Sequence, residues 1–146
     1  MTDTRMFDEA AFFQTCSGCR RVDADLERYV GLDFRLTRSA AALNFRQLKV
    51  NKREAAMFGQ PGSDQYAQTL ANAVDLGQIA ELIAAQEGGK SGVLLNDGRF
   101  NIFPVLGKDS ALYSVLIRCD VGRWDVHCYP FRATRMLNIG HRVFSN

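Results

Sequence analysis

In the first ninety residues, apolar side chains recur at the spacing of amphipathic helices, and glycine or proline separates the runs. The segment 7–13 has acids near its start, which suits the positive end of a helix dipole. The alanine-rich segment 36–57 also favours a helix, with a less regular interval around Val50 and Asn51. This pattern predicts a first part of the chain, about 5–88, that is built of helices.

Two more helices are indicated by residues suited to capping. Ser63 precedes one apolar run and Asp75 precedes the next, and both side chains can accept hydrogen bonds from backbone amides in a first helical turn. The apolar positions of the two runs are Tyr66, Leu70 and Val74, then Leu76, Ile79, Leu82 and Ile83. The glycine pair at 88–89 is a typical end for the second helix.

From residue 92 onward the apolar spacing shortens to two, as in strands. Hairpin loops are indicated at 97–98, 107–110 and 121–122. They give a register in which Ile102 lies opposite Val115 and Cys119 lies opposite Trp124. One side of the sheet then collects Val93, Leu95, Phe100, Ile102, Val115, Ile117, Cys119, Trp124, Val126 and Cys128. A short alternating run at 139–144 predicts a fifth strand that closes or edges this sheet.

These patterns predict a single α+β domain over residues 1–146. We expect its helical part, about 5–88, to pack on a four- to five-stranded antiparallel β-meander over about 92–145. A length of 146 residues suits one core, and 47% apolar with 23% charged residues is ordinary for a globular chain. We see no signal peptide and no membrane span, so we expect a cytoplasmic protein without a membrane partner.

The opposite side of the predicted sheet mixes cations, aromatic rings and aliphatic side chains. Its members are Arg99, Phe103, Leu116, Arg118, Asp125, His127 and Tyr129. Aromatic residues and arginine are favoured at protein interfaces, and Asp125 lies opposite Arg118, which it can neutralise. This face therefore predicts a non-catalytic protein-binding or regulatory domain that docks a protein partner and needs no cofactor.

A metal-independent ribonuclease on the same face is the enzyme alternative. Phosphodiester cleavage needs a proton donor, a proton acceptor and a cation. His127, Arg118 and Tyr129 can supply these groups. Small ribonucleases present such groups on an antiparallel sheet, which is a likeness of architecture alone.

Nucleic-acid binding is a third hypothesis, because basic residues gather in the segment 35–53 without any acid among them. The candidate contacts are Arg46, Lys49, Lys52 and Arg53, and nearby amide side chains can contact bases. A net charge of +2 does not by itself imply such a partner. A solvated helix face explains the same run of charges.

Cys16 and Cys19 have the spacing with which two thiolates bind one zinc ion or form a redox pair. The predicted register separates Cys119 from Cys128 by about 13 Å, too far to share an ion or a disulfide. His127 and His141 remain as further ligands. Because helix packing accounts for the two cysteines equally well, we predict no metal, with zinc at Cys16 and Cys19 as the alternative.

Overall fold

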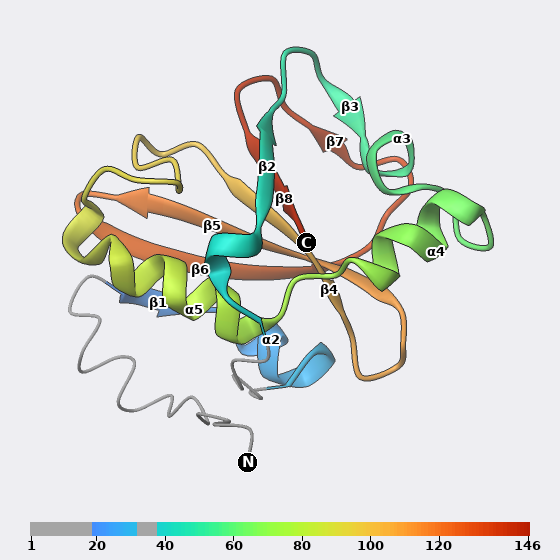
Figure 1. Ribbon diagram of the computed structural model, residues 1–146, viewed down its shortest axis with the longest axis horizontal. Helices are drawn as coiled ribbons and strands as arrows, with labels where there is room; N and C mark the ends of the chain where they lie inside the picture. The colour runs from blue at the N-terminus through green and yellow to red at the C-terminus, as the bar shows by residue number, and fades with distance from the viewer. Residues whose placement is uncertain (1–18, 32–37) are drawn as a thin grey trace.

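The computed structural model describes residues 19–31 and 38–146, and of residues 19–21 it describes the backbone. Within this part of the chain, a six-stranded sheet has the order β1-β6-β5-β4-β8-β2 (Figure 1). The strands are β1 (Cys19–Val22), β2 (Asn44–Gln47), β4 (Asn101–Leu106), β5 (Leu112–Asp120), β6 (Arg123–Pro130) and β8 (Arg142–Ser145). A second, two-stranded sheet pairs β3 (Lys52–Arg53) with β7 (Met136–Leu137).

The helices of this part are α2 (Ala24–Tyr29), α3 (Glu54–Phe58), α4 (Asp64–Ala71) and α5 (Leu76–Ala85), with single 3₁₀ turns at η1 (Ala40–Ala42) and η2 (Glu87–Gly89). Both predicted caps are confirmed. The Ser63 hydroxyl accepts the Tyr66 amide at 3.1 Å. Asp75 forms a capping box with Gln78, whose side-chain oxygen accepts the Asp75 amide at 3.0 Å. α4 ends before Val74.

The α+β class is confirmed, but two finer predictions are wrong. Strands β1, β2 and β3 lie inside the segment expected to be helical. The sheet is mixed, because β1 runs parallel to β6 and β4 runs parallel to β8. At 40–47 a 3₁₀ turn and a strand replace the predicted helix, since pairing with β8 outweighs the weak preference of alanine. The helix expected at 7–13 lies outside the described residues.

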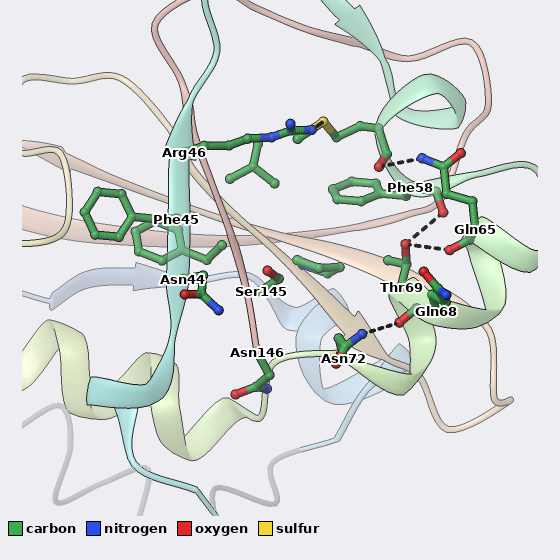
Figure 2. A pocket seen from close by; sticks show the side chains of 14 residues that line it. Asn44, Phe45, Arg46, Phe58, Gln65, Gln68, Thr69, Asn72, Ser145 and Asn146 are labelled. Atoms are coloured by element: carbon green, nitrogen blue, oxygen red, sulfur yellow. Dashed lines mark hydrogen bonds between the residues drawn. The ribbon is translucent and has the colours of Figure 1, made fainter.

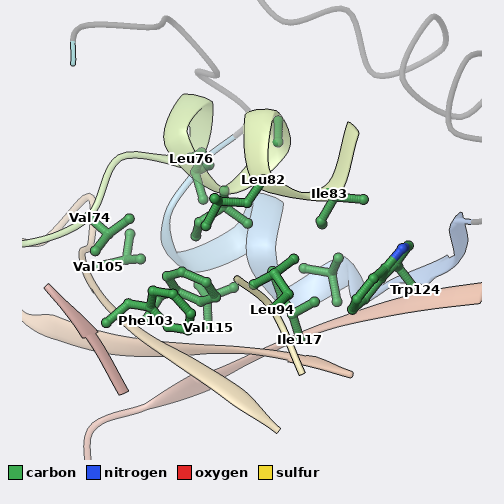
Figure 3. Close-up of a cluster of buried hydrophobic side chains, with 14 of the residues drawn as sticks. Val74, Leu76, Leu82, Ile83, Leu94, Phe103, Val105, Val115, Ile117 and Trp124 are labelled. Atoms are coloured by element: carbon green, nitrogen blue, oxygen red, sulfur yellow. The ribbon is translucent and has the colours of Figure 1, made fainter. Parts of the chain in front are cut away.

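The sheet is buried on both faces at its centre, where six consecutive residues of β5, from Leu112 to Ile117, are buried. On one face, α5 lies over the sheet and directs Leu76, Leu82 and Ile83 toward it (Figure 3). The sheet side of this first cluster includes Phe103, Val105, Val115, Ile117, Trp124 and Phe144. Burying each such side chain contributes roughly 1.5–3 kcal/mol.

A smaller second cluster covers the opposite face, which we call the outer face. It consists of Leu48, Phe58, Ile102, Leu112, Leu116, Leu137 and Val143. These residues come from α3, β7 and the strands, so α3 and the small sheet cover part of the outer face. The exposed sheet face predicted from the sequence is therefore smaller than expected.

The predicted register is confirmed for one hairpin and wrong for the next. β5 and β6 pair Cys119 with Trp124 and Arg118 with Asp125, as predicted. β4 and β5 pair Ile102 with Leu116, one residue away from the predicted partner Val115. The one-residue slip turns Ile102 to the outer face and Phe103 into the first cluster.

The predicted strand at 92–95 is absent, and two buried amides hold this segment instead. The Gln86 side chain bonds the amide of Leu94 at 2.7 Å and its carbonyl at 3.1 Å. The Asn101 side chain does the same for Leu95, at 2.8 and 3.1 Å. Side-chain amides thus satisfy the backbone groups that a hairpin ladder would have satisfied.

β8 lies between β4 and β2 in the sheet, so it is not an edge strand. The chain enters β8 through a bulge at Gly140 and His141, where the Leu48 carbonyl accepts the Gly140 amide and the Leu48 amide donates to the His141 carbonyl, both at 2.8 Å. Gly140 has φ +91 and an added Cβ would come within 3.0 Å of the Arg99 guanidinium. Glycine is therefore required at this bulge.

The β5–β6 turn contains a strained residue. Val121 has φ 51, followed by Gly122 with φ 73, and Val121 is 90% exposed. A positive φ at the first turn position suits asparagine far better than a β-branched residue. We expect Val121→Asn to stabilise the fold by about 1 kcal/mol, measured as a higher midpoint of urea unfolding.

The matched control is Val50→Asn, because Val50 is 56% exposed and has an ordinary negative φ. Its free energy of unfolding should stay within about 0.5 kcal/mol of that of the wild type. Equal effects of the two substitutions would show that replacing an exposed valine with a polar residue, and not relief of strain in the turn, changes the stability.

Candidate functional site

The predicted binding residues separate into two groups in the structure. Arg118, Asp125, His127 and Tyr129 lie on the outer face of β5 and β6, as predicted. Phe103 is wrong as a binding residue, because it is fully buried in the first cluster as a result of the β4 slip. Leu116 is on the predicted face but is only 9% exposed and packs in the second cluster.

Phe100 is the centre of the exposed part of the outer face. Its ring centroid lies 6.2 Å from that of His127 and 5.4 Å from that of His141, in edge-on contacts. The Arg118 guanidinium carbon lies 5.6 Å above the same ring. Both histidines of the chain therefore contact one phenylalanine, although they are remote in sequence.

The contacts continue along β6 to Tyr129. The rings of His127 and Tyr129 stack with centroids 6.3 Å apart, and the Arg135 guanidinium carbon lies 4.9 Å above the Tyr129 ring. Such cation–π contacts contribute about 0.5–1 kcal/mol at exposed sites. We call this connected set the outer-face array: Arg99, Phe100, Arg118, His127, Tyr129, Arg135 and His141.

Arg99 borders the array next to His141. It donates to Asp97 at 2.6 Å, and Arg99 holds the pKa of the Asp97 carboxyl below its ordinary value. Burial lowers the pKa of His141, and the positive charge of Arg99 lowers it further. His141 therefore favours the neutral imidazole near neutral pH.

Each arginine of the array has a carboxylate partner. Arg99 pairs with Asp97, and the Arg118 Nε lies 3.7 Å from Asp125, which is only 2% exposed. Arg135 lies 3.4 Å from Glu54. The array thus presents guanidinium groups and rings with little excess charge.

Glu54 is a fully buried carboxylate at the start of α3. Its oxygens accept the Arg132 amide at 2.8 Å, the Ser114 hydroxyl at 3.3 Å and the Arg135 guanidinium at 3.4 Å. Burial raises the pKa of Glu54 above its ordinary 4.5, and these hydrogen bonds and the charge of Arg135 oppose the rise. Glu54 fixes Arg135 in the position from which it covers Tyr129.

The predicted nucleic-acid residues do not form one helix face. Arg46 is exposed on β2, Lys49 is exposed in the connection that follows, and Lys52 and Arg53 form β3. We call the segment 46–53 the basic arm, since it projects from the sheet beyond β2 and returns into α3 (Figure 1). None of its four cations makes an ion pair with another residue of the described segments.

A pocket with a volume of about 330 Å³ opens at the base of the basic arm, between β2, β8 and α4 (Figure 2). Its lining includes the buried apolar side chains of Phe58 and Val143, which we call its floor. Its walls carry amide and hydroxyl side chains: Asn44, Gln65, Gln68, Thr69, Asn72 and Ser145. Arg46 stands at its rim (Figure 2). Asn146 also lines the pocket, and no Asp or Glu side chain of the described residues does.

The cysteine predictions are tested in part. Cys119 and Cys128 are buried free thiols, and burial raises the pKa of Cys128 to about 12, so it stays protonated. Cys16 lies outside the described residues, and of Cys19 the backbone alone is described, in β1. Zinc at Cys16 and Cys19 therefore stays an untested alternative to the prediction of no metal. Elsewhere in the described chain, no three His, Cys, Asp or Glu side chains gather as a metal site requires.

No protein-family model, no curated protein and no solved structure matches this chain. None of the helices that the structure describes has the length and apolar character needed to cross a bilayer.

Sequence reasoning missed three members of the array. Phe100 was assigned to the buried side, because a strand was expected before it. His141 was considered only as a zinc ligand, and Arg135 fell in a segment without regular pattern. Asn101, which follows Phe100, is the signal that could have placed Phe100. Asn101 is fully buried, and a buried amide must be hydrogen-bonded, here to Leu95.

Glu54 generates a pH-dependent prediction. Because its folded pKa lies above the unfolded value, the native state binds the proton more tightly, and the stability due to Glu54 falls as pH rises above about 4.5. Glu54→Gln cannot ionise. We therefore expect the unfolding free energy of the variant to increase relative to that of the wild type as pH rises above about 4.5.

Urea unfolding of both proteins from acid to neutral pH measures this difference. Glu81→Gln, which changes an exposed carboxylate on α5, is the matched control and should leave the pH trend unchanged. Parallel stability curves for the wild type and Glu54→Gln would contradict the prediction.

Proposed function

We propose that this protein is a non-catalytic protein-binding domain that docks a partner through the outer-face array. The observation that carries this proposal is that each arginine of the array has its own carboxylate while the rings beside it remain partly exposed. Tyr129 is 39% exposed, and the side chain of Arg118 is also 39% exposed. Tyrosine and arginine are enriched among residues that dominate binding energy at protein interfaces.

The electrostatics favour a protein over a polyanion at this surface. A polyanionic partner is held by cations that are free to neutralise phosphates, whereas the array's arginines already face Asp97, Asp125 and Glu54. The ring contacts around Phe100 and Tyr129 also hold the side chains in place before binding. Less conformational entropy is then lost when a partner docks.

Tyr129→Ala tests this function. The tagged wild type captures the partner from a lysate of its own cells after nuclease treatment, and calorimetry then measures the dissociation constant of the purified partner. Because the exposed ring of Tyr129 supports both His127 and Arg135, we expect the variant to bind at least about thirtyfold more weakly, as at an interface hot spot.

Leu106→Ala is the matched control, since Leu106 is 49% exposed at the far end of β4 and belongs to neither surface. Its affinity should equal that of the wild type. A partner that binds Tyr129→Ala as tightly as the wild type docks elsewhere, and the proposal would then be wrong.

A metal-independent ribonuclease is a second candidate, favoured by one observation: His141 joins His127 at Phe100. A neutral His141 would take the proton from a ribose 2′-hydroxyl, whose oxygen attacks phosphorus. The bond to the 5′-oxygen would break as protonated His127 donates to it, leaving a 2′,3′-cyclic phosphate. Arg118 would stabilise the charge on the phosphoryl oxygens.

The test is cleavage of a fluorescent oligoribonucleotide in the presence of a chelator. We expect His127→Ala and His141→Ala each to lower the rate by at least about a hundredfold, as for loss of a general acid or base, with unchanged circular dichroism. Wild-type protein that leaves the RNA intact would eliminate the enzyme candidate without affecting the docking proposal.

A further inference from the structure

The pocket and the basic arm lie apart from the outer-face array in composition and in charge. The pocket is lined by residues of β2, α3, α4, β4 and β8, and none of its lining residues belongs to the array. We propose that the pocket and the basic arm form a binding site for single-stranded nucleic acid, with one base in the pocket and adjoining phosphates on the arm.

The size and lining of the pocket suit a base. A volume of about 330 Å³ lies at the lower end of the range for small-molecule sites. Phe58 and Val143 give it an apolar floor against which a flat ring can lie. Around this floor, amide groups offer both donors and acceptors, which are the groups that read the edges of bases.

Several of these polar groups have bonding capacity left. The side chains of Asn44 and Gln68 make no hydrogen bond to another described residue. Gln65 donates to the carbonyls of Ala56 and Met57, at 3.3 and 3.2 Å, which holds its amide in place and leaves its oxygen as an acceptor. Asn72 likewise donates to the Gln68 carbonyl at 2.9 Å and keeps its oxygen. The wall side chains Gln65 and Asn72 are thus held in position, while their oxygens and the amides of Asn44 and Gln68 remain available to a ligand.

The charges around the pocket indicate an anionic ligand. The Arg46 guanidinium contacts the neutral Met57 sulfur at 2.9 Å, so its charge is not compensated there. Arg53 precedes α3 directly, and Met57 of α3 lines the pocket one helical turn later. One leg of the basic arm therefore meets the pocket directly through Arg46, and the other leads into α3, whose Met57 and Phe58 line the pocket.

The extent of the basic arm favours a strand over a single nucleotide. Arg46 belongs to β2, Lys49 to the connection between β2 and β3, and Lys52 begins β3, so the cations are spread along the arm. Successive phosphates of a single strand can follow such a line of cations while one base turns into the pocket. An acidic peptide such as polyglutamate would meet the same cations but has no flat ring to lie against the apolar residues of the pocket.

The experiment is fluorescence anisotropy with labelled oligonucleotides of about ten nucleotides, a length within the usual range of site sizes. Single-stranded poly-A, poly-C and poly-U are compared, with a duplex and a polyglutamate peptide as competitors. We expect binding of the single strands with a preference among bases. For four phosphate contacts, the affinity should fall with salt with a logarithmic slope of about −3.

Two variants separate the contributions of charge and pocket. Arg46→Gln/Lys49→Gln/Lys52→Gln/Arg53→Gln should bring the salt slope close to zero. Lys90→Gln/Lys108→Gln/Arg123→Gln/Arg132→Gln removes the same charge from exposed positions elsewhere and should keep the slope. Asn44→Ala/Gln68→Ala should weaken the preferred oligonucleotide by about tenfold and reduce the differences between bases.

Each outcome supports or overturns the proposal. The proposal is supported if Asn44→Ala/Gln68→Ala loses the preference among bases and if only the fourfold variant of the basic arm loses the salt dependence. No binding at low salt overturns it. Equal competition by polyglutamate, or identical slopes for the two charge variants, would show a general polyanion surface and would also overturn it. None of these results bears on docking at the outer-face array.

Discussion

The fold depends on burying β5 on both faces. From Leu112 to Ile117 this strand has no solvent-facing side, so one layer must cover each face of the sheet. α5 supplies the first layer, and α3 with the β3–β7 pair supplies the second. The second layer reaches only part of the outer face, and the uncovered part carries the outer-face array. Core packing thus determines where a functional surface can exist.

The same constraint explains which features the sequence could predict. Local signals were sufficient for the caps at Ser63 and Asp75 and for the β5–β6 register, which a two-residue turn at Val121 and Gly122 fixes. They were insufficient for β4. In a strand buried on both faces nearly every residue is apolar, so a slip of one residue leaves the pattern equally satisfied.

The candidate sites show the same division. Arg118, Asp125, His127 and Tyr129 were found because they belong to the hairpin with the fixed register. Phe100, Arg135 and His141 were not, because their positions follow from contacts between segments remote in sequence. The pocket could not be predicted either, since its lining comes from five elements and amides carry no periodic signal. The two surfaces also differ in electrostatics. Carboxylates neutralise the arginines of the outer-face array, whereas the cations of the basic arm have no such partner among the described residues.

The place of β8 has a consequence for how the chain folds. β2 pairs only with β8 in the described sheet, so Asn44 must find Ser145 across most of the chain. Closing so long a loop costs entropy before any contact compensates for it, whereas the β5–β6 hairpin closes locally. We therefore expect the hairpin to form early and the β2–β8 pairing to form late. A folding rate limited by this closure would make the basic arm the last surface that the protein acquires.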